Sequence, residues 1–184
     1  MTTAPTEGRL PVFRVGGLVV TTALVGVMLA WLYFGMRAVM DIGGACATGG
    51  PYVPAVECPQ GAAVLISIAP PVLLLSTFAA TGLAVTMGAP TLLLPMWFLL
   101  FGSLGWNFLE YAFSEDGIVF GWLVPGIMFE AMALPALFLW VGSGVLRRAG
   151  GGPEVRAARR WKAAQLAIIA VGVGVGVLTF DAWT

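Results

Sequence analysis

The sequence has few charged residues and no histidine at all. Charged residues make up 10% of its 184 residues, whereas about a quarter of an ordinary soluble domain is charged. Hydrophobic residues make up 59% of the chain, and its mean hydropathy is +0.95. Because so few charges do not cover the surface of a water-soluble protein of this size, the composition predicts an integral membrane protein.

The missing residue types also limit the chemistry. Without histidine the chain lacks the commonest metal ligand and the usual proton carrier at neutral pH. Its one lysine, Lys162, lies outside the apolar runs, which excludes a retinal Schiff base. The two cysteines suit a single disulfide on an oxidising face better than a metal site, which usually has about four ligands. We therefore expect no metal, no cofactor and no nucleic-acid partner.

One polar stretch, residues 41–61, separates the first apolar run from the rest. It reads DIGGACATGGPYVPAVECPQG and contains three prolines and both cysteines, Cys46 and Cys58. The loop they would close has 13 residues, counting both cysteines, and closing a loop of that size is worth about 3 kcal/mol on the chain-entropy model. We predict a Cys46–Cys58 disulfide. It either keeps a polar loop from fraying or preorganises a recognition surface, since a rigid loop loses less entropy on binding.

The loop also carries a resemblance. Its pattern GGxCAxGGPYxxxxxCPxG at residues 43–61 resembles uncharacterised polytopic membrane proteins of actinobacteria. The resemblance covers the loop and the end of the first apolar run. It implies a bacterial source and a membrane location, and it implies no activity.

The apolar runs predict an all-α bundle of five membrane-spanning helices in a single domain, 1–184. The apolar part of the first run is about 25 residues long, longer than the ~7–15 of a signal peptide, so we expect an uncleaved span. The 48 residues of 62–109 are too long for one span, because such a helix would measure ~72 Å against a hydrocarbon core of ~30 Å. Gly88 and Pro90 mark the corner between two spans. The predicted spans are about 12–39, 62–87, 91–109, 118–146 and 163–180.

The basic residues predict how the chain is oriented. Arg9 and Arg14 flank the start of the first span, and the loop 147–162 holds six of the nine basic residues. The positive-inside rule assigns both groups to the cytoplasm, which requires an even number of spans between them. We therefore expect a bacterial plasma-membrane protein with a cytoplasmic N-terminus, an outer loop 40–61 and a C-terminus outside. The basic loop could bind anionic lipid headgroups, although topology alone accounts for it equally well.

Glu130 is the one acidic residue in the middle of a predicted span. A charged carboxylate at that depth costs at least about 2.5 kcal/mol, so we expect it to be protonated, hydrogen-bonded or facing water. Ser76, Thr77 and Thr81 of the span 62–87 lie at comparable depth and are its candidate partners.

Two further polar residues lie near the outer end of the span 91–109. Asn107 and Glu110 are three residues apart and share a helix face. Together with Glu130 they predict a polar track from the outer surface to the middle of the membrane. The alternative is that Glu130 is a neutral structural carboxyl that ties helices together.

The last span carries Gly172 and Gly176, which are four residues apart. Small residues at this spacing let two helices approach closely. We expect this face to pack within the protein, with a membrane protein partner as the alternative.

These observations lead to two functional hypotheses. The first is a membrane scaffold or accessory subunit that presents the outer loop, with the lipid bilayer and a membrane protein as its partners and no catalysis. The alternative is a small proton- or cation-coupled transporter or channel component that uses Glu130. An intramembrane enzyme ranks third, because the chain has no histidine and no evident serine–base pair or paired intramembrane aspartates.

Overall fold

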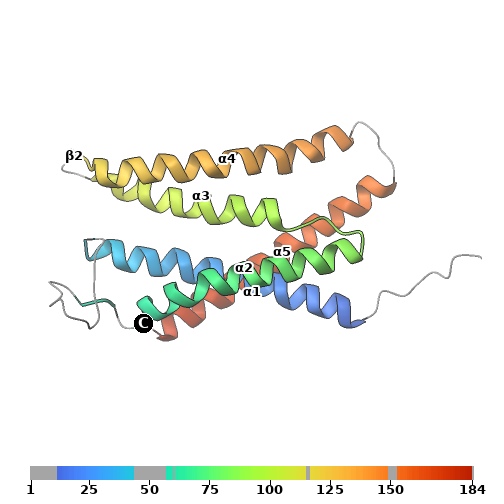
Figure 1. Ribbon diagram of the computed structural model, residues 1–184, viewed down its shortest axis with the longest axis horizontal. Helices are drawn as coiled ribbons and strands as arrows, with labels where there is room; N and C mark the ends of the chain where they lie inside the picture. Colours follow the sequence, from blue (N-terminus) through green and yellow to red (C-terminus); the bar gives the residue numbers. More distant parts are fainter. Residues whose placement is uncertain (1–11, 44–56, 60, 115–116, 149–152, 184) are drawn as a thin grey trace, which may run out of the picture.

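The protein is a bundle of helices with one short β-hairpin, as seen in a computed structural model that describes residues 12–43, 57–59, 61–114, 117–148 and 153–183 (Figure 1). The expected all-α bundle is confirmed for this part of the chain. The two strands pair antiparallel, with Phe113 opposite Ile118. The elements are α1 (Val12–Asp41), α2 (Ala62–Thr86), α3 (Leu93–Ala112), β1 (Phe113–Ser114), β2 (Gly117–Ile118), α4 (Phe120–Arg148) and α5 (Pro153–Trp183).

Four of these helices are long and apolar enough to cross a membrane, which indicates a membrane-embedded protein. Among the described residues, the four candidate spans are Val12–Met40, Ala62–Thr86, Phe120–Gly142 and Arg156–Trp183. The 20-residue helix α3 is not one of them, because Asn107 and Glu110 lower the hydropathy of its second half. The structure therefore supports a helical bundle with four candidate spans, and the fifth span remains a prediction.

The corner between α2 and α3 forms where the sequence predicts it. The N–H of Met87 donates to the carbonyl oxygen of Ala84 at 3.1 Å, and the N–H of Gly88 donates to that of Val85 at 3.2 Å. Gly88 has a φ of +66°, a conformation that only glycine adopts without strain. The chain can therefore turn here, and α3 begins a few residues later.

Helix α5 begins earlier than the sequence analysis predicts. The segment 147–162 is expected as an aqueous loop, yet α5 is helical from Pro153 onward. Proline is favourable at the first position of a helix, and Ala157, Ala158 and the arginines after it are good helix formers. Local helix propensity therefore extends the last helix into the basic segment. The other helices begin and end within a few residues of the predicted spans.

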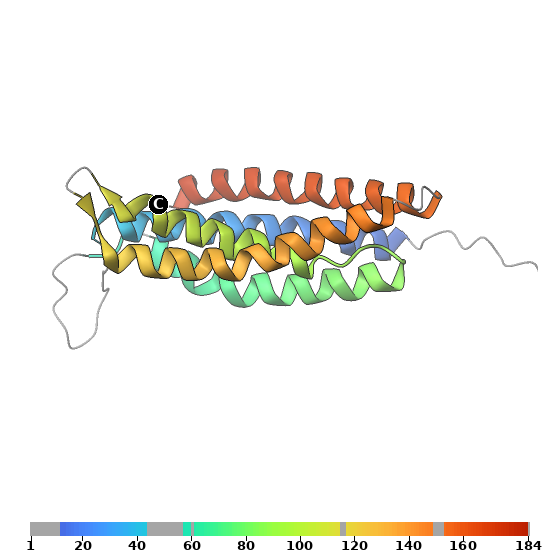
Figure 2. The same ribbon diagram turned by 90° about the horizontal axis from the view of Figure 1, so that it is seen from above.

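The helices form two groups. α1 packs against both α2 and α5, while α4 packs against α3. Figure 2 shows α5 along one side of α1 and α2 along the other. A smaller contact between α1 and α3 joins the α3–α4 pair to the other three helices. The end of α1, the start of α2 and the β-hairpin lie at the same end of the bundle (Figure 1).

Glycines bring α1 and α5 into backbone contact. A Cβ atom on Gly172 would lie 2.1 Å from the carbonyl oxygen of Ala23, and one on Gly26 would lie 2.3 Å from that of Ile169. Gly176 also faces α1. The face of α5 that carries Gly172 and Gly176 is thus covered by α1 of the same chain, as the internal-packing interpretation expects.

The outward faces of the helices are apolar. Leu75 on α2, Phe138 on α4 and Leu178 on α5 leave 71%, 69% and 72% of their surface exposed. Water would not solvate so many large apolar side chains favourably, whereas lipid does. These faces support the membrane location that the composition predicts.

Candidate functional site

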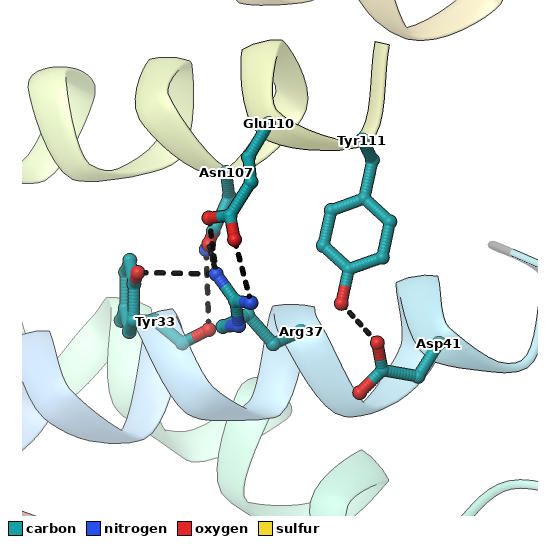
Figure 3. A network of polar contacts seen from close by, with 6 residues as sticks. All are labelled: Tyr33, Arg37, Asp41, Asn107, Glu110 and Tyr111. Carbon is teal, nitrogen blue, oxygen red and sulfur yellow. Dashed lines mark hydrogen bonds and ion pairs between the residues drawn. The ribbon is translucent and has the colours of Figure 1, made fainter. Parts of the chain in front are cut away.

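Six polar side chains gather between α1 and α3 at the end of the bundle that holds the β-hairpin (Figure 3). One set recurs every four residues on α1, so its members lie along one face of that helix. The other set occupies the last turns of α3 at spacings of three and four residues. The six residues, which we call the α1–α3 polar cluster, are Tyr33, Arg37 and Asp41 from α1 and Asn107, Glu110 and Tyr111 from α3.

An ion pair between Arg37 and Glu110 lies at the centre of the cluster. Nη1 of Arg37 lies 2.5 Å from Oε2 of Glu110, and Nη2 lies 3.0 Å from Oε1. The guanidinium therefore binds the carboxylate with both of its terminal nitrogens, the geometry in which arginine pairs most strongly and most specifically. Glu110 follows the apolar run that ends at Leu109, and the hydrogen bond from Arg37 lowers its pKa below the usual value of 4.5.

Asn107 is fully buried and bridges the two helices below the ion pair. Its Nδ2 donates to the backbone carbonyl oxygen of Tyr33 at 3.2 Å, and its Oδ1 accepts from Nη1 of Arg37 at 3.4 Å. The hydroxyl of Tyr33 accepts from the same Nη1 at 3.3 Å. The guanidinium also lies near two aromatic rings, 5.8 Å from the centre of Tyr33 and 5.5 Å from that of Tyr111. Arg37 is thus held on several sides.

Tyr111 forms the last link between the helices, at the residue where α1 ends. Its hydroxyl donates to Oδ1 of Asp41. Burial, followed by this hydrogen bond, raises the pKa of Tyr111 to about 12, so the phenol is protonated at neutral pH. Each of the six side chains therefore has a partner within the cluster.

Glu130, which belongs to α4, packs against a different side of α3 from the one that carries the cluster. Its carboxyl group packs over Gly105, where an added Cβ would meet Oε1 at 2.9 Å. Gly105 and Asn107 are two residues apart, which is about 200° around a helix, so Glu130 and the α1–α3 polar cluster lie on opposite faces of α3. No hydrogen bond to the Glu130 carboxyl is found among the described residues.

None of the three α2 hydroxyl groups proposed as partners of Glu130 bonds to it: the hydroxyl of Thr81 is buried with no partner among the described residues, and the other two bond elsewhere. Ser76 donates to the carbonyl oxygens of Val72 and Leu73 at 2.7 and 3.0 Å, and Thr77 donates to that of Leu73 at 2.7 Å. These are bonds to the preceding turn of α2 itself. Of the candidate site residues, the structure thus brings Asn107 and Glu110 together, and it leaves Glu130 apart from them and from the α2 hydroxyls.

Sequence reasoning missed the α1 side of the cluster. It grouped Asn107 and Glu110 but did not assign them Arg37 as a partner. A signal was present, because the predicted topology sets Arg37 among several acidic residues at the outer end with no other basic residue. The predicted Cys46–Cys58 disulfide lies outside the described residues, because Cys46 falls in the segment 44–56, and it stays a prediction.

Within the described ranges, no group of three histidine, cysteine or acidic side chains could hold a metal ion. No protein-family model, no curated protein and no solved structure matches the chain. Two sites of the structure therefore bear on function, the α1–α3 polar cluster and the carboxyl of Glu130.

Proposed function

We propose that this protein is a non-catalytic scaffold or accessory subunit of a bacterial plasma membrane, which presents the outer loop 40–61 to a membrane protein partner. In this proposal α3 is a fifth span, the N-terminus lies in the cytoplasm and the C-terminus lies outside. The loop is closed by the Cys46–Cys58 disulfide. Because α1 covers the Gly172 and Gly176 face, the loop is the proposed partner surface.

The observation that carries the proposal is the position of the α1–α3 polar cluster, which lies at the end of α1 where this loop begins. Asp41, the last residue of α1, is bonded to Tyr111, and one turn earlier Arg37 is paired with Glu110. The first residues of α2, where the loop ends, are anchored as well, since Ala62 is fully buried. A loop with both ends held loses less entropy when it binds a partner, which favours a role in presentation.

The polar residues also favour this role over transport. A proton or cation path needs acidic and polar groups that face one another or water. In the α1–α3 polar cluster these groups are bonded to one another, and Glu130 lies across α3 from them. The cluster is therefore better suited to fixing α1 against α3 than to conducting ions.

A partner-retention experiment tests the scaffold role. The full-length protein is purified in a mild detergent, and any stoichiometric partner is identified. A variant in which residues 44–56 are replaced by a glycine–serine linker of equal length should lose that partner, while Glu130→Gln should keep it. Retention of the partner by the linker variant would contradict the proposal, as would a wild-type protein that purifies alone.

Single cysteines test the proposed orientation. In a background without Cys46 and Cys58, cysteines at Thr48 and Gly151 should label oppositely with a membrane-impermeant maleimide on intact cells. Thr48→Cys should react, because the first outer loop faces outside. Labelling of Gly151→Cys from outside would contradict the five-span topology.

One observation favours the alternative, a proton- or cation-coupled transporter or channel component that uses Glu130. Its carboxyl group has no hydrogen-bond partner among the described residues and lies between Pro125 and Pro135 of α4, each of which removes one backbone N–H from the helix. Loosened backbone beside a carboxyl occurs where membrane helices bind ions. Flux driven by a pH gradient into liposomes, compared between wild type and Glu130→Gln, tests this role. Equal flux in the two forms would remove it.

A further inference from the structure

A hollow of about 490 Å³ lies on the side of α5 near its start. Its described lining residues recur at spacings of one, three and four, so they form one continuous stripe along the helix. The stripe combines two arginines, one tryptophan and two small side chains. The lining residues are Arg156, Ala157, Arg160, Trp161 and Ala164.

The charged residues that line this hollow are both positive. Arg156 and Arg160 are both exposed and are one helical turn apart. Neither arginine takes part in the ion pair between Arg37 and Glu110, which lies at the other end of the bundle. Two adjacent guanidinium groups present several N–H donors in a planar arrangement that matches the oxygens of a phosphate. The hollow is therefore complementary to a phosphate group.

The hollow also lies where a phospholipid headgroup would be. Arg156 is the first residue of the candidate span Arg156–Trp183, so the lining residues occupy the first turns of a helix that enters the membrane. Trp161 is half-buried and packs against the hydrophobic core, and tryptophan prefers the membrane–water interface. The small side chains of Ala157 and Ala164 leave room beside the arginines on the same stripe.

We propose that this hollow binds one anionic phospholipid, with the phosphate between Arg156 and Arg160 and the start of an acyl chain along Ala157 and Ala164. The volume supports a lipid over free phosphate, because it falls within the ~300–1,000 Å³ of typical small-molecule sites and exceeds what a lone phosphate fills. This site requires only that α5 enters the membrane, so it stands or falls separately from the scaffold role.

Lipid titration of matched arginine variants tests the site. Phosphatidylglycerol is titrated into the purified protein in detergent, and bound lipid is counted by native mass spectrometry. Arg156→Gln and Arg160→Gln should each weaken binding about fivefold, which corresponds to the ~1 kcal/mol that one basic residue contributes near an anionic lipid. Arg159→Gln is the control, because it removes the same charge from an exposed neighbour that does not line the hollow. It should bind as tightly as wild type.

A second variant tests the hollow without changing its charge. Ala164 is exposed and lines the hollow, so Ala164→Leu should fill part of it and weaken lipid binding while the protein still folds. Thermal unfolding of each variant in lipid-free detergent checks that folding is intact.

Three results would overturn the proposal. Equal weakening by Arg159→Gln would mean that the basic segment attracts lipid only through its overall charge. Equal binding of phosphatidylcholine would mean that the negative charge of the headgroup is not recognised. Displacement of phosphatidylglycerol by millimolar inorganic phosphate, with Ala164→Leu binding like wild type, would mean that the site takes a phosphate ion and not a lipid.

Discussion

The close contact between α1 and α5 makes Gly172→Ala the sharpest test of the fold. A Cβ at this position would lie 2.1 Å from the carbonyl oxygen of Ala23 and 2.9 Å from its carbonyl carbon, whereas ordinary contacts begin at 3.4 Å. The atoms in the way belong to the backbone of α1, so no side-chain rotation relieves the clash. The two helices must separate by roughly 1 Å along a closely packed contact.

The size of the effect follows from two opposing terms. Forcing an extra carbon into a well-packed contact costs about 1–3 kcal/mol. Alanine in place of a helical glycine contributes about 0.5–1 kcal/mol in the other direction. We therefore expect Gly172→Ala to lower the free energy of unfolding by roughly 1–2 kcal/mol.

Gly174→Ala is a matched control two residues away on the same helix. A Cβ there has no heavy atom within 4 Å, so only the gain in helix propensity remains, and stability should rise by up to about 1 kcal/mol. Thermal unfolding in detergent, followed by circular dichroism, compares the two, and Tm should shift by about 2–4 °C per kcal/mol. The same Tm for both variants would refute the close approach of α1 and α5.

Three other measurements address single side chains. Because Arg37 lowers the pKa of Glu110 below 4.5, the ion pair should stabilise the fold above about pH 4.5 and cease to do so as the pH falls through the lowered pKa. Glu110→Gln should abolish this loss of Tm in acid, and the same dependence of Tm on pH in both forms would contradict the pairing. Tyr111 should titrate by ultraviolet absorbance near its raised pKa of about 12, with stability falling as the pH rises from 10 towards 12; Tyr111→Phe should remove this signal, which the bond to Asp41 helps to produce. The buried hydroxyl of Thr22 has no partner among the described residues. Thr22→Val should therefore leave Tm unchanged or raise the free energy of unfolding by up to about 1 kcal/mol. A clear loss of stability would show that the hydroxyl is bonded.

The sequence alone was enough to predict a membrane-embedded bundle and most of its helix ends. A span is recognised from length and hydropathy, which are properties of consecutive residues. The corner at Gly88 was predictable for the same reason, because positive φ is a local property of one residue. Where local signals competed, the prediction was less accurate. The basic composition of 147–162 suggested a loop, but its helix propensity begins α5 at Pro153.

Only the tertiary structure decided which residues meet. Arg37 and Glu110 are 73 positions apart, and no pattern within either helix identifies the other as its partner. Glu130 of α4 and Asn107 of α3 lie on neighbouring helices but do not meet. Glu130 packs over Gly105, on the side of α3 opposite to the buried Asn107. The physical reason is that these helices are apolar on nearly every face, so periodicity does not distinguish an inward face from a lipid-facing one. Their rotation and pairing are decided by close packing and by a few polar contacts between helices, and these exist only once the bundle has formed.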